Sequence, residues 1–217
     1  MRDEGPQEIT PELLLHAYAS GVFPMAENAD GEEIFWIDPK SRGIIPLDGL
    51  HVSRSLRKRI RQGGFSVRWD AAFRQVVEAC ADRSETWIND EILDLYDELY
   101  RRGYAHSVEV YVDGALAGGL YGVSMGGAFF GESMFSIARD ASKIALIYLV
   151  ARLRQGGYTL LDTQFVTDHL LSLGAVEITR EAYHRRLDAA LRVPAQYWAM
   201  EASDDPQLVL QLSTQMS

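Results

Sequence analysis

The chain has 217 residues, a formal net charge of -10 at pH 7 and 47% hydrophobic residues, so it can bury one sizeable core and is not a disordered chain. Its single cysteine, Cys80, excludes an internal disulfide bond and any zinc site built from several cysteines. The sequence has neither a signal-like apolar stretch near its start nor an apolar run long enough to cross a membrane, and we therefore expect a cytosolic protein.

Residues 1–49 are predicted to form a small, loop-rich N-terminal domain. Thr10 can cap a helix whose first turn holds Pro11, and Gly21 is placed to end it. The short strand-like pieces that follow are broken by Pro24, Pro39 and Pro46. Trp36 lies among them, where a bulky aromatic residue either fills a small core or offers a stacking platform for a base.

The chain is acidic as a whole, but residues 49–69 contain no acidic side chain. The basic residues of this stretch are Arg54, Arg57, Lys58, Arg59, Arg61 and Arg68. A local basic patch of this kind can hold phosphate groups by electrostatic attraction. A solvated helix face is the alternative, because runs of charge are usually that. The absence of interleaved acidic residues favours a polyanionic partner.

Residues 50–217 are predicted to form an α+β domain with a mixed sheet. Two helices are expected first, over residues 71–83 and 91–103, and then a three-stranded meander over 106–136 and a buried helix over 144–153. A strand over 158–166, a short helix over 168–175, a strand over 176–178 and a closing helix over 180–192 follow. Gly126 and Gly127 fit a hairpin turn within the meander. Asp168 is expected to cap the short helix, and His169 beside it is a minor candidate for a catalytic role.

The stretch over residues 118–136 combines six glycines with aromatic residues and one carboxylate, Glu132. Glycine weakens a strand, so a strand that keeps this many usually lets another backbone or a ligand come close. A carboxylate among apolar neighbours needs a partner or a cationic ligand to offset its desolvation. The alternative is a glycine-rich hairpin whose one glutamate faces solvent.

Asp162 and Gln164 form a second polar group, near the end of an otherwise apolar strand. Residues two apart in a strand share a face. The Asp162 carboxylate can accept a hydrogen bond from the Gln164 amide, fix its orientation and leave the amide oxygen for an incoming amine. The alternative is a polar pair that only binds the following turn.

Several common catalytic motifs do not occur in the sequence. The five histidines are scattered without the spacing of metal ligands, and no Walker-type phosphate loop is found. The segment GESMF at 131–135 lacks the second glycine of a nucleophile elbow. We therefore expect no metal and no cofactor.

The assembled pattern resembles the bacterial leucyl/phenylalanyl-tRNA–protein transferases, from about Thr10 to Trp198. The motifs that carry the resemblance are GVFPM, FWIDP, LHVSRSL, TWI, HSVEV, GGLYGV, GESMFS, ASK and LLDTQFVTDH. The resemblance implies a small N-terminal domain and a C-terminal domain similar to GCN5-type acetyltransferases. It also implies transfer of Leu or Phe, less often Met, from aminoacyl-tRNA to the α-amino group of proteins that begin with Arg or Lys. Such proteins are then degraded by the N-end rule pathway.

The same resemblance implies roles for individual residues of this chain. Trp36 matches the residue that stacks on the terminal adenosine of the tRNA. The other residues matched to the aminoacyl-adenosine site are Trp87, Tyr96 and Phe129, together with Leu120 and Leu149, where better-known members carry Met and Phe. The matches to the tRNA acceptor-stem contacts are Arg54, Arg57 and Lys58. The match to the acceptor-binding residue is Glu132, and the matches to the catalytic polar residues are Asp162 and Gln164. Thr167 stands where better-known members have Asn.

The implied reaction suits these residues. An aminoacyl ester is already activated, so the enzyme has to align an amine with the ester carbonyl, and good alignment can supply roughly 7–11 kcal/mol. A neutral amide is a feeble base, and Gln164 is therefore expected to orient the amine more than to remove its proton. Glu132 suits a basic N-terminal side chain through a charge-assisted hydrogen bond.

Two alternatives come from other classes of protein. A coenzyme-A-dependent N-acetyltransferase needs a glycine-rich turn at a helix start to bind the pyrophosphate, and the matching segment over residues 136–143 has no glycine. A non-catalytic RNA-binding adaptor would use the basic patch and the aromatic residues. It would have no use for the polar group formed by Glu132, Asp162 and Gln164.

Overall fold

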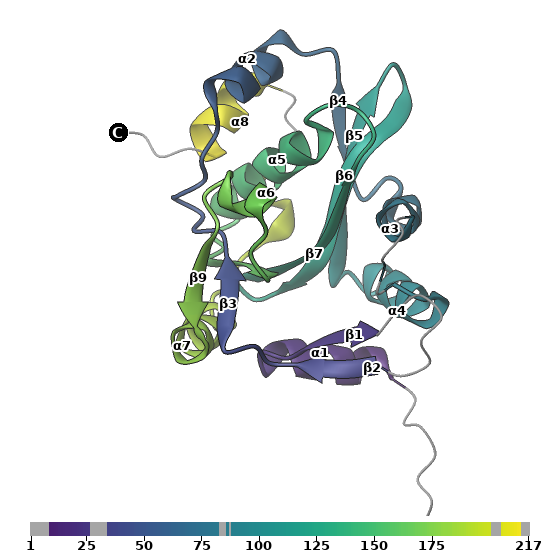
Figure 1. Cartoon of the computed structure of the whole chain (residues 1–217), viewed down its shortest axis with the longest axis vertical. Coiled ribbons are helices and arrows are strands. Elements are labelled where there is room, and N and C mark those ends of the chain that lie inside the picture. The colour runs from purple at the N-terminus through teal and green to yellow at the C-terminus, as the bar shows by residue number, and fades with distance from the viewer. Residues whose placement is uncertain (1–8, 27–33, 83–85, 87, 201–204, 214–217) are drawn as a thin grey trace, which may run out of the picture.

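The structure is a computed structural model that describes residues 9–26, 34–82, 86, 88–200 and 205–213. Within these residues a seven-stranded sheet carries helices on both faces, and a two-stranded sheet lies at one end of the molecule beside helix α1, Pro11–Ala19 (Figure 1). The strands of the large sheet follow the order β4-β5-β6-β7-β8-β3-β9. The predicted α+β class with a mixed sheet is confirmed.

The strands are β1 Phe23–Ala26, β2 Ile34–Ile37, β3 Ser41–Ile44, β4 Ser66–Trp69, β5 Ala105–Val112, β6 Ala115–Met125, β7 Ala128–Ser136, β8 Leu160–Gln164 and β9 Val176–Thr179. The remaining helices are α2 Arg54–Gln62, α3 Phe73–Ala81, α4 Asp90–Arg101, α5 Ala141–Gln155, α6 Asp168–Leu171, α7 Arg180–Ala190, the 3-10 turn η1 Tyr197–Ala199 and α8 Pro206–Ser213.

The pairing of β7 with β8 gives the sheet its mixed character. These two strands run parallel, whereas every other described pair is antiparallel. Their register runs from Ala128 opposite Leu160 to Phe130 opposite Asp162 and then stops. Beyond that point the two strands are no longer paired, and their polar residues face a gap in the ladder.

Each face of the sheet has its own core. Helix α5 covers one face together with α2 and α8, and between Ala141 and Leu153 every residue of α5 except Lys143 is buried. This confirms the prediction of a helix that is apolar nearly all round. Helices α1, α3, α4 and α7 supply the core on the opposite face.

The N-terminal residues contribute to both sheets. Thr10 caps α1 by accepting a hydrogen bond from the Leu13 backbone N–H at 3.2 Å, as predicted. Strands β1 and β2 form the separate antiparallel pair. Strand β3 precedes the predicted boundary at residue 49, yet it pairs with β8 and β9 in the large sheet. The division into residues 1–49 and 50–217 stays a prediction.

Two local predictions were wrong or incomplete. Helix α6 is capped by Thr167, which accepts from the Leu170 backbone N–H, and not by Asp168, because Thr167 holds the extended backbone that a cap requires. Helix α8 was not predicted at all; it buries Val209 and Leu210 against the core that contains α5. None of the described helices is both long and apolar enough to cross a membrane.

Candidate active site

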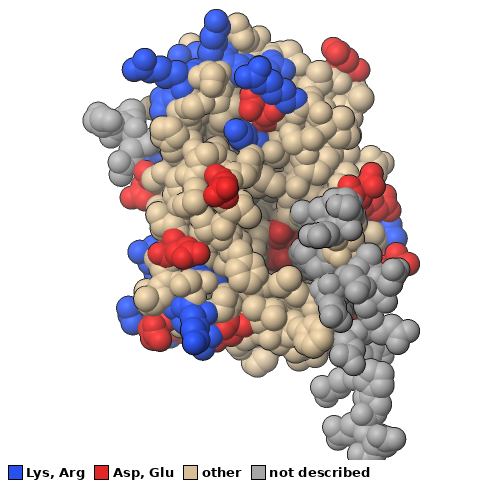
Figure 2. Space-filling view, viewed as in Figure 1, with Lys and Arg blue, Asp and Glu red and all other residues tan. Residues whose placement is uncertain are grey.

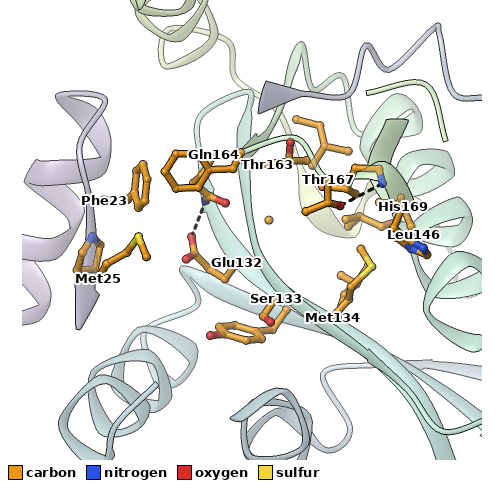
Figure 3. A pocket seen from close by; sticks show the side chains of 18 residues that line it. Phe23, Met25, Glu132, Ser133, Met134, Leu146, Thr163, Gln164, Thr167 and His169 are labelled. Carbon is orange, nitrogen blue, oxygen red and sulfur yellow. Dashed lines mark hydrogen bonds between the residues drawn. The ribbon is translucent and has the colours of Figure 1, made fainter. Parts of the chain in front are cut away.

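A pocket of about 370 Å³ opens where β7 and β8 part. Its lining residues are Phe23, Pro24, Met25, Leu120, Tyr121, Gly131, Glu132, Ser133, Met134, Leu146, Leu149, Leu161, Thr163, Gln164, Phe165, Thr167, His169 and Leu170. Figure 3 shows Glu132 and Gln164 together at one end, beside Phe23 and Met25. His169 and Thr167 lie at the other end, beside Leu146. The pocket therefore has apolar walls and two polar ends.

Glu132 is the extra residue of a β-bulge. Gly122 of β6 faces Gly131, and the adjacent Tyr121 faces Ser133, so Glu132 has no partner across the ladder. A bulge bends its strand and turns a side chain in a new direction. Here it aims a partly buried carboxylate at the polar end of the pocket.

The Glu132 carboxylate is held by neutral donors from three different elements. The Tyr18 hydroxyl of α1 donates to Oε1 at 2.8 Å, and the Tyr96 hydroxyl of α4 donates to Oε2 at 2.9 Å. The Gln164 Nε2 group donates to Oε1 at 3.3 Å (Figure 3). No lysine, arginine or histidine of the described chain forms an ion pair with Glu132.

The burial of Glu132 changes its acidity. Desolvation raises the pKa of Glu132 to about 7, and the charge of Asp162 adds to the rise. The hydrogen bonds from Tyr18 and Tyr96 and the charge of Arg42 oppose it without cancelling it. A carboxyl group with a pKa near neutrality, at the end of a pocket, is a candidate for binding a cation or exchanging a proton.

Asp162 lies on the neighbouring strand and has a cationic partner of its own. Arg42 donates from Nε to Oδ1 at 2.9 Å and from Nη2 to Oδ2 at 2.5 Å, and both side chains are buried. The guanidinium carbon of Arg42 lies 4.5 Å from the ring centre of Phe23 and 4.4 Å from that of Tyr183. The Tyr183 hydroxyl also donates to Asp162 Oδ2 at 2.8 Å. Asp162 is thus held within a closed buried network.

Gln164 has an unusual backbone. Its φ is +55°, in the left-handed region that residues other than glycine rarely adopt. The Phe165 backbone N–H donates to the Thr163 carbonyl at 2.6 Å, which closes a tight three-residue turn around Gln164. Strained backbone of this kind costs about 1–3 kcal/mol and is concentrated at functional sites.

The structure corrects the expected contact between Asp162 and Gln164. The Gln164 side-chain amide donates to Glu132, and it is the Gln164 backbone N–H that donates to Asp162 Oδ1, at 2.9 Å. The reversed turn at Gln164 explains the difference, because it takes the side chain off the strand face that the simple alternation predicts. Asp162 therefore holds the Gln164 backbone, and Glu132 orients its amide.

Two buried polar atoms of the pocket lining, one of them at the His169 end, have no hydrogen-bond partner among the described residues. They are Thr163 Oγ1 and His169 Nε2. Desolvation, and to a smaller extent the charge of Lys143, lowers the pKa of His169. The walls between the two ends are apolar, with Leu120, Leu149 and Leu161 among them.

The sequence-predicted residues fall into groups. Leu120 and Leu149 line the pocket together with Glu132 and Gln164. Tyr96 is buried and touches Glu132. Phe129 is also buried, but its ring packs against Tyr197 with centroids 6.0 Å apart, and it is not among the lining residues.

One predicted tryptophan lies outside the pocket lining, and the other is not among the described residues. Trp36 is on β2, with 38% of its surface exposed, opposite Pro24, which does line the pocket. Trp87 lies outside the described residues. The adenosine contacts expected of both residues stay predictions.

Five of the six residues of the predicted basic patch lie on helix α2, and the sixth, Arg68, lies on β4. Arg54 and Lys58 are exposed and Arg57 is partly buried, with its Nε donating to the Val52 carbonyl at 3.1 Å. Figure 2 shows basic side chains gathered over the end of the molecule where Figure 1 places α2. This end of the molecule is distant from the part of the pocket that holds Glu132, which lies next to β1.

Sequence reasoning missed three residues that hold the two carboxylates. Tyr18 lies near the end of the first predicted helix, and its aromatic ring indicates burial but not its partner. Arg42 lies in a segment without periodicity, and Tyr183 in a helix of mixed charge, so neither gave a usable signal. Among the described residues, no group of three or more His, Cys, Asp or Glu side chains could hold a metal ion.

Comparison with known proteins gives consistent matches. Residues 44–188 match the family described as leucyl/phenylalanyl-tRNA protein transferase, and residues 7–40 match the N-terminal domain of that family. A leucyl/phenylalanyl-tRNA–protein transferase of Ruegeria sp. (strain TM1040) is 60% identical over 209 residues, which are 96% of this chain and 99% of the relative. One of Cereibacter sphaeroides (strain ATCC 17029 / ATH 2.4.9) is 57% identical over 217 residues, 98% and 99% of the two chains.

A solved structure is similar at a much greater distance. The structure of L-PGS from Bacillus licheniformis is 15% identical with a TM-score of 0.42, and the match covers 76% of this chain and 56% of that chain.

Proposed function

This chain belongs to the leucyl/phenylalanyl-tRNA protein transferase family, and on that premise we propose that it transfers an amino acid from aminoacyl-tRNA to proteins. The amino acid is Leu or Phe, possibly extended to Met, and the acceptor is the α-amino group of a protein that begins with Arg or Lys. Transfer marks the acceptor for degradation by the N-end rule pathway. The observation that carries the acceptor assignment is Glu132, a carboxylate in a pocket that only neutral donors hold.

The reaction requires alignment more than activation. The acceptor nitrogen attacks the ester carbonyl carbon, a C–N bond forms, the bond from that carbon to the ribose oxygen breaks, and a proton passes from the amine to the leaving oxygen. Gln164 suits the alignment, because its Nε2 is bound to Glu132 and its amide oxygen is left to accept from the amine. Good alignment can supply roughly 7–11 kcal/mol.

Asp162 acts in this proposal as a positioning residue. It holds the Gln164 backbone at 2.9 Å, and Arg42 and Tyr183 hold Asp162 in turn. The strained turn at Gln164 needs such support, since a residue in the left-handed region persists only when its surroundings fix it. The predicted catalytic pair thus works as a unit through the backbone.

The apolar walls suit the side chain of the transferred amino acid. Leu120, Leu149 and Leu161 line the pocket, and none of them offers a polar group to a ligand. We place Phe129 behind this wall and Tyr96 beside Glu132, with the aminoacyl-adenosine site continuing toward Trp36. We assign Trp87 to the same aminoacyl-adenosine site.

Helix α2 is proposed as the contact to the tRNA. Its first turn has no acidic residue and holds Arg54 and Arg57, and Lys58 follows directly. Phosphate groups are attracted both by these side chains and by the positive end of the helix dipole. The similarity of the larger domain to GCN5-type acetyltransferases stays a prediction.

The test is a transfer assay with tRNA charged with labelled Leu, Phe or Met and a panel of peptides that differ only in the first residue. We expect labelled Leu or Phe to appear on peptides that begin with Arg or Lys. Gln164→Ala should lower turnover strongly while tRNA binding stays near normal, which an RNA-binding adaptor would not show. Acetyl transfer from acetyl-CoA to the same peptides, without transfer from charged tRNA, would contradict the proposal.

A further inference from the structure

Glu132, Tyr18 and Tyr96 form a closed triangle of hydrogen-bonding groups. The two phenolic oxygens are 2.5 Å apart. The Tyr18 oxygen is 2.8 Å from Glu132 Oε1, and the Tyr96 oxygen is 2.9 Å from Oε2. We call these three side chains the tyrosine–glutamate ring. It joins α1, α4 and β7 at the end of the pocket that holds Glu132.

The number of protons on the ring decides whether it can close. Each of the three contacts needs one hydrogen between its two oxygens, and a phenol carries only one. With Glu132 ionised, the phenols supply two hydrogens for three contacts, and two oxygens 2.5 Å apart without a hydrogen repel each other. With Glu132 protonated, each contact has its own hydrogen, and the ring closes in one direction.

We propose that the free protein keeps one proton on the tyrosine–glutamate ring, and that a basic N-terminal residue of the acceptor displaces it on binding. This inference rests on the proposed function, because it uses a cationic acceptor. The guanidinium or ammonium group then takes the place of the proton as the counter-charge of Glu132. Tyr18 and Tyr96 become positioning residues that hold the carboxylate in either state.

The surroundings of the ring favour the same proton balance. The titratable and charged groups that act on it are Tyr18 from α1, Tyr96 from α4, Tyr121 from β6, Asp162 from β8 and Arg42 from β3. Burial, together with the charge of Glu132, raises the pKa of both ring phenols well above the usual value, so neither phenol gives up its proton. Burial and the charge of Asp162 raise the pKa of Glu132 further than the hydrogen bonds of the two phenols and the charge of Arg42 lower it, so Glu132 is the group that exchanges its proton.

An acceptor with an uncharged N-terminal side chain encounters the same site in its protonated state. A side chain without charge cannot replace the proton, and the ring then stays closed and neutral. A basic acceptor gains the Glu132 carboxylate as its counter-charge only when the proton leaves the tyrosine–glutamate ring. The apparent affinity for a basic acceptor should therefore increase about tenfold for each unit by which the pH is raised, until the ring has lost its proton. At higher pH the affinity should be constant.

The first experiment measures proton release during acceptor binding. A peptide with N-terminal Arg is titrated into the full chain by calorimetry in buffers of different ionisation heat, at about pH 6 and about pH 9. A matched peptide with N-terminal citrulline, which is neutral and has the same shape, gives the baseline for the peptide's own α-amino group. We expect the Arg peptide to release close to one additional proton at the lower pH and almost none at the higher pH.

The variant Tyr18→Phe separates the ring from ordinary hydrogen bonding. It opens the triangle, so Glu132 no longer needs its proton, and the release at low pH should shrink. If the phenols merely donate to an ionised carboxylate, removing one donor should instead raise the release, and this outcome would overturn the proposal. Unchanged release would show that Tyr18 has only a packing role and would overturn it as well.

A second measurement needs no acceptor. The infrared band of a protonated carboxyl group should be present in the free protein at about pH 6, fade toward pH 9, and be absent in Glu132→Gln. Its absence from the unaltered protein at low pH would overturn the ring proposal. If no peptide binds at any pH, the acceptor assignment fails while this band still tests the ring.

Discussion

Asp162 and Glu132 are two carboxylates on neighbouring strands, of which only Glu132 lines the pocket, and they are held in opposite ways. Asp162 has a buried guanidinium partner, Arg42, with two hydrogen bonds between them. Glu132 has two phenols and an amide, all neutral. The fold thus neutralises one carboxylate itself and leaves the other without a cation. A ligand can supply a counter-charge only at Glu132.

The backbone explains why the two carboxylates differ. Asp162 stands at the last position of β8 that pairs with β7, opposite Phe130, and its side chain is buried. Glu132 stands in a bulge of β7, two residues past Phe130 and outside the ladder. A paired residue becomes part of the core, whereas a bulged one is turned toward the space beside the sheet.

The largest effect should come from removing the charge of Asp162. Asp162→Asn leaves Arg42 buried without its counter-charge, and breaking a buried ion pair in this way costs about 3–5 kcal/mol of unfolding free energy. Glu132→Gln removes no ion pair and, at about pH 5, where folded Glu132 is itself neutral, should change stability by less than about 1.5 kcal/mol. Denaturant unfolding of both variants measures the difference.

A double variant serves as the control for this experiment. Replacing Arg42 and Asp162 together by Leu removes both charges, and it should be less damaging than the sum of the two single replacements. Equal losses for Asp162→Asn and Glu132→Gln would remove the distinction between the two carboxylates.

A smaller effect concerns the pH dependence of stability. The pKa of Glu132 is raised from 4.5 to about 7 in the fold, so between these values the folded state binds more protons than the unfolded state. Its stability should therefore fall as the pH rises from about 4.5 to about 7. Glu132→Gln should remove this part of the fall, seen as the difference between two series of melting curves. Parallel curves for the two proteins would contradict the raised pKa.

The smallest effect concerns the turn at Gln164. Gly adopts a φ of +55° without strain, whereas Ala does not. Gln164→Gly should therefore be more stable than Gln164→Ala by about 1 kcal/mol, while both variants lose turnover because both lack the amide. Retained turnover in either variant would mean that the strain at this position serves the fold alone.

The sequence predicted the fold better than it predicted the contacts of the site. The meander and the buried helix α5 follow from local alternation and apolar runs, and the structure confirms both. Glu132 and Gln164 were found because a polar residue in an apolar strand stands out. The partners were not found, because Tyr18 lies 114 residues from Glu132 and Arg42 lies 120 residues from Asp162. No local pattern encodes a contact at that separation.

The wrong contact between Asp162 and Gln164 has a similar cause. Strand periodicity assumes an extended backbone at every position, and the left-handed φ at Gln164 breaks that assumption. Glycine or asparagine would have indicated such a turn, but glutamine does not. The sequence did not predict the bulge at Glu132 either, because glycines in a strand also indicate the close approach of a ligand or another backbone.

The central claim is that Glu132 binds the positively charged N-terminal side chain of the acceptor. The choice between Arg and citrulline at the N-terminus tests this claim most directly. Transfer of labelled Leu from charged tRNA is measured for both peptides in competition, with the unaltered chain and with Glu132→Gln. A hydrogen bond to a charged group is worth about 1.5–3 kcal/mol, so the unaltered chain should prefer Arg about ten- to a hundredfold, and the variant should accept both peptides nearly equally. The same preference for Arg in both proteins would contradict the account.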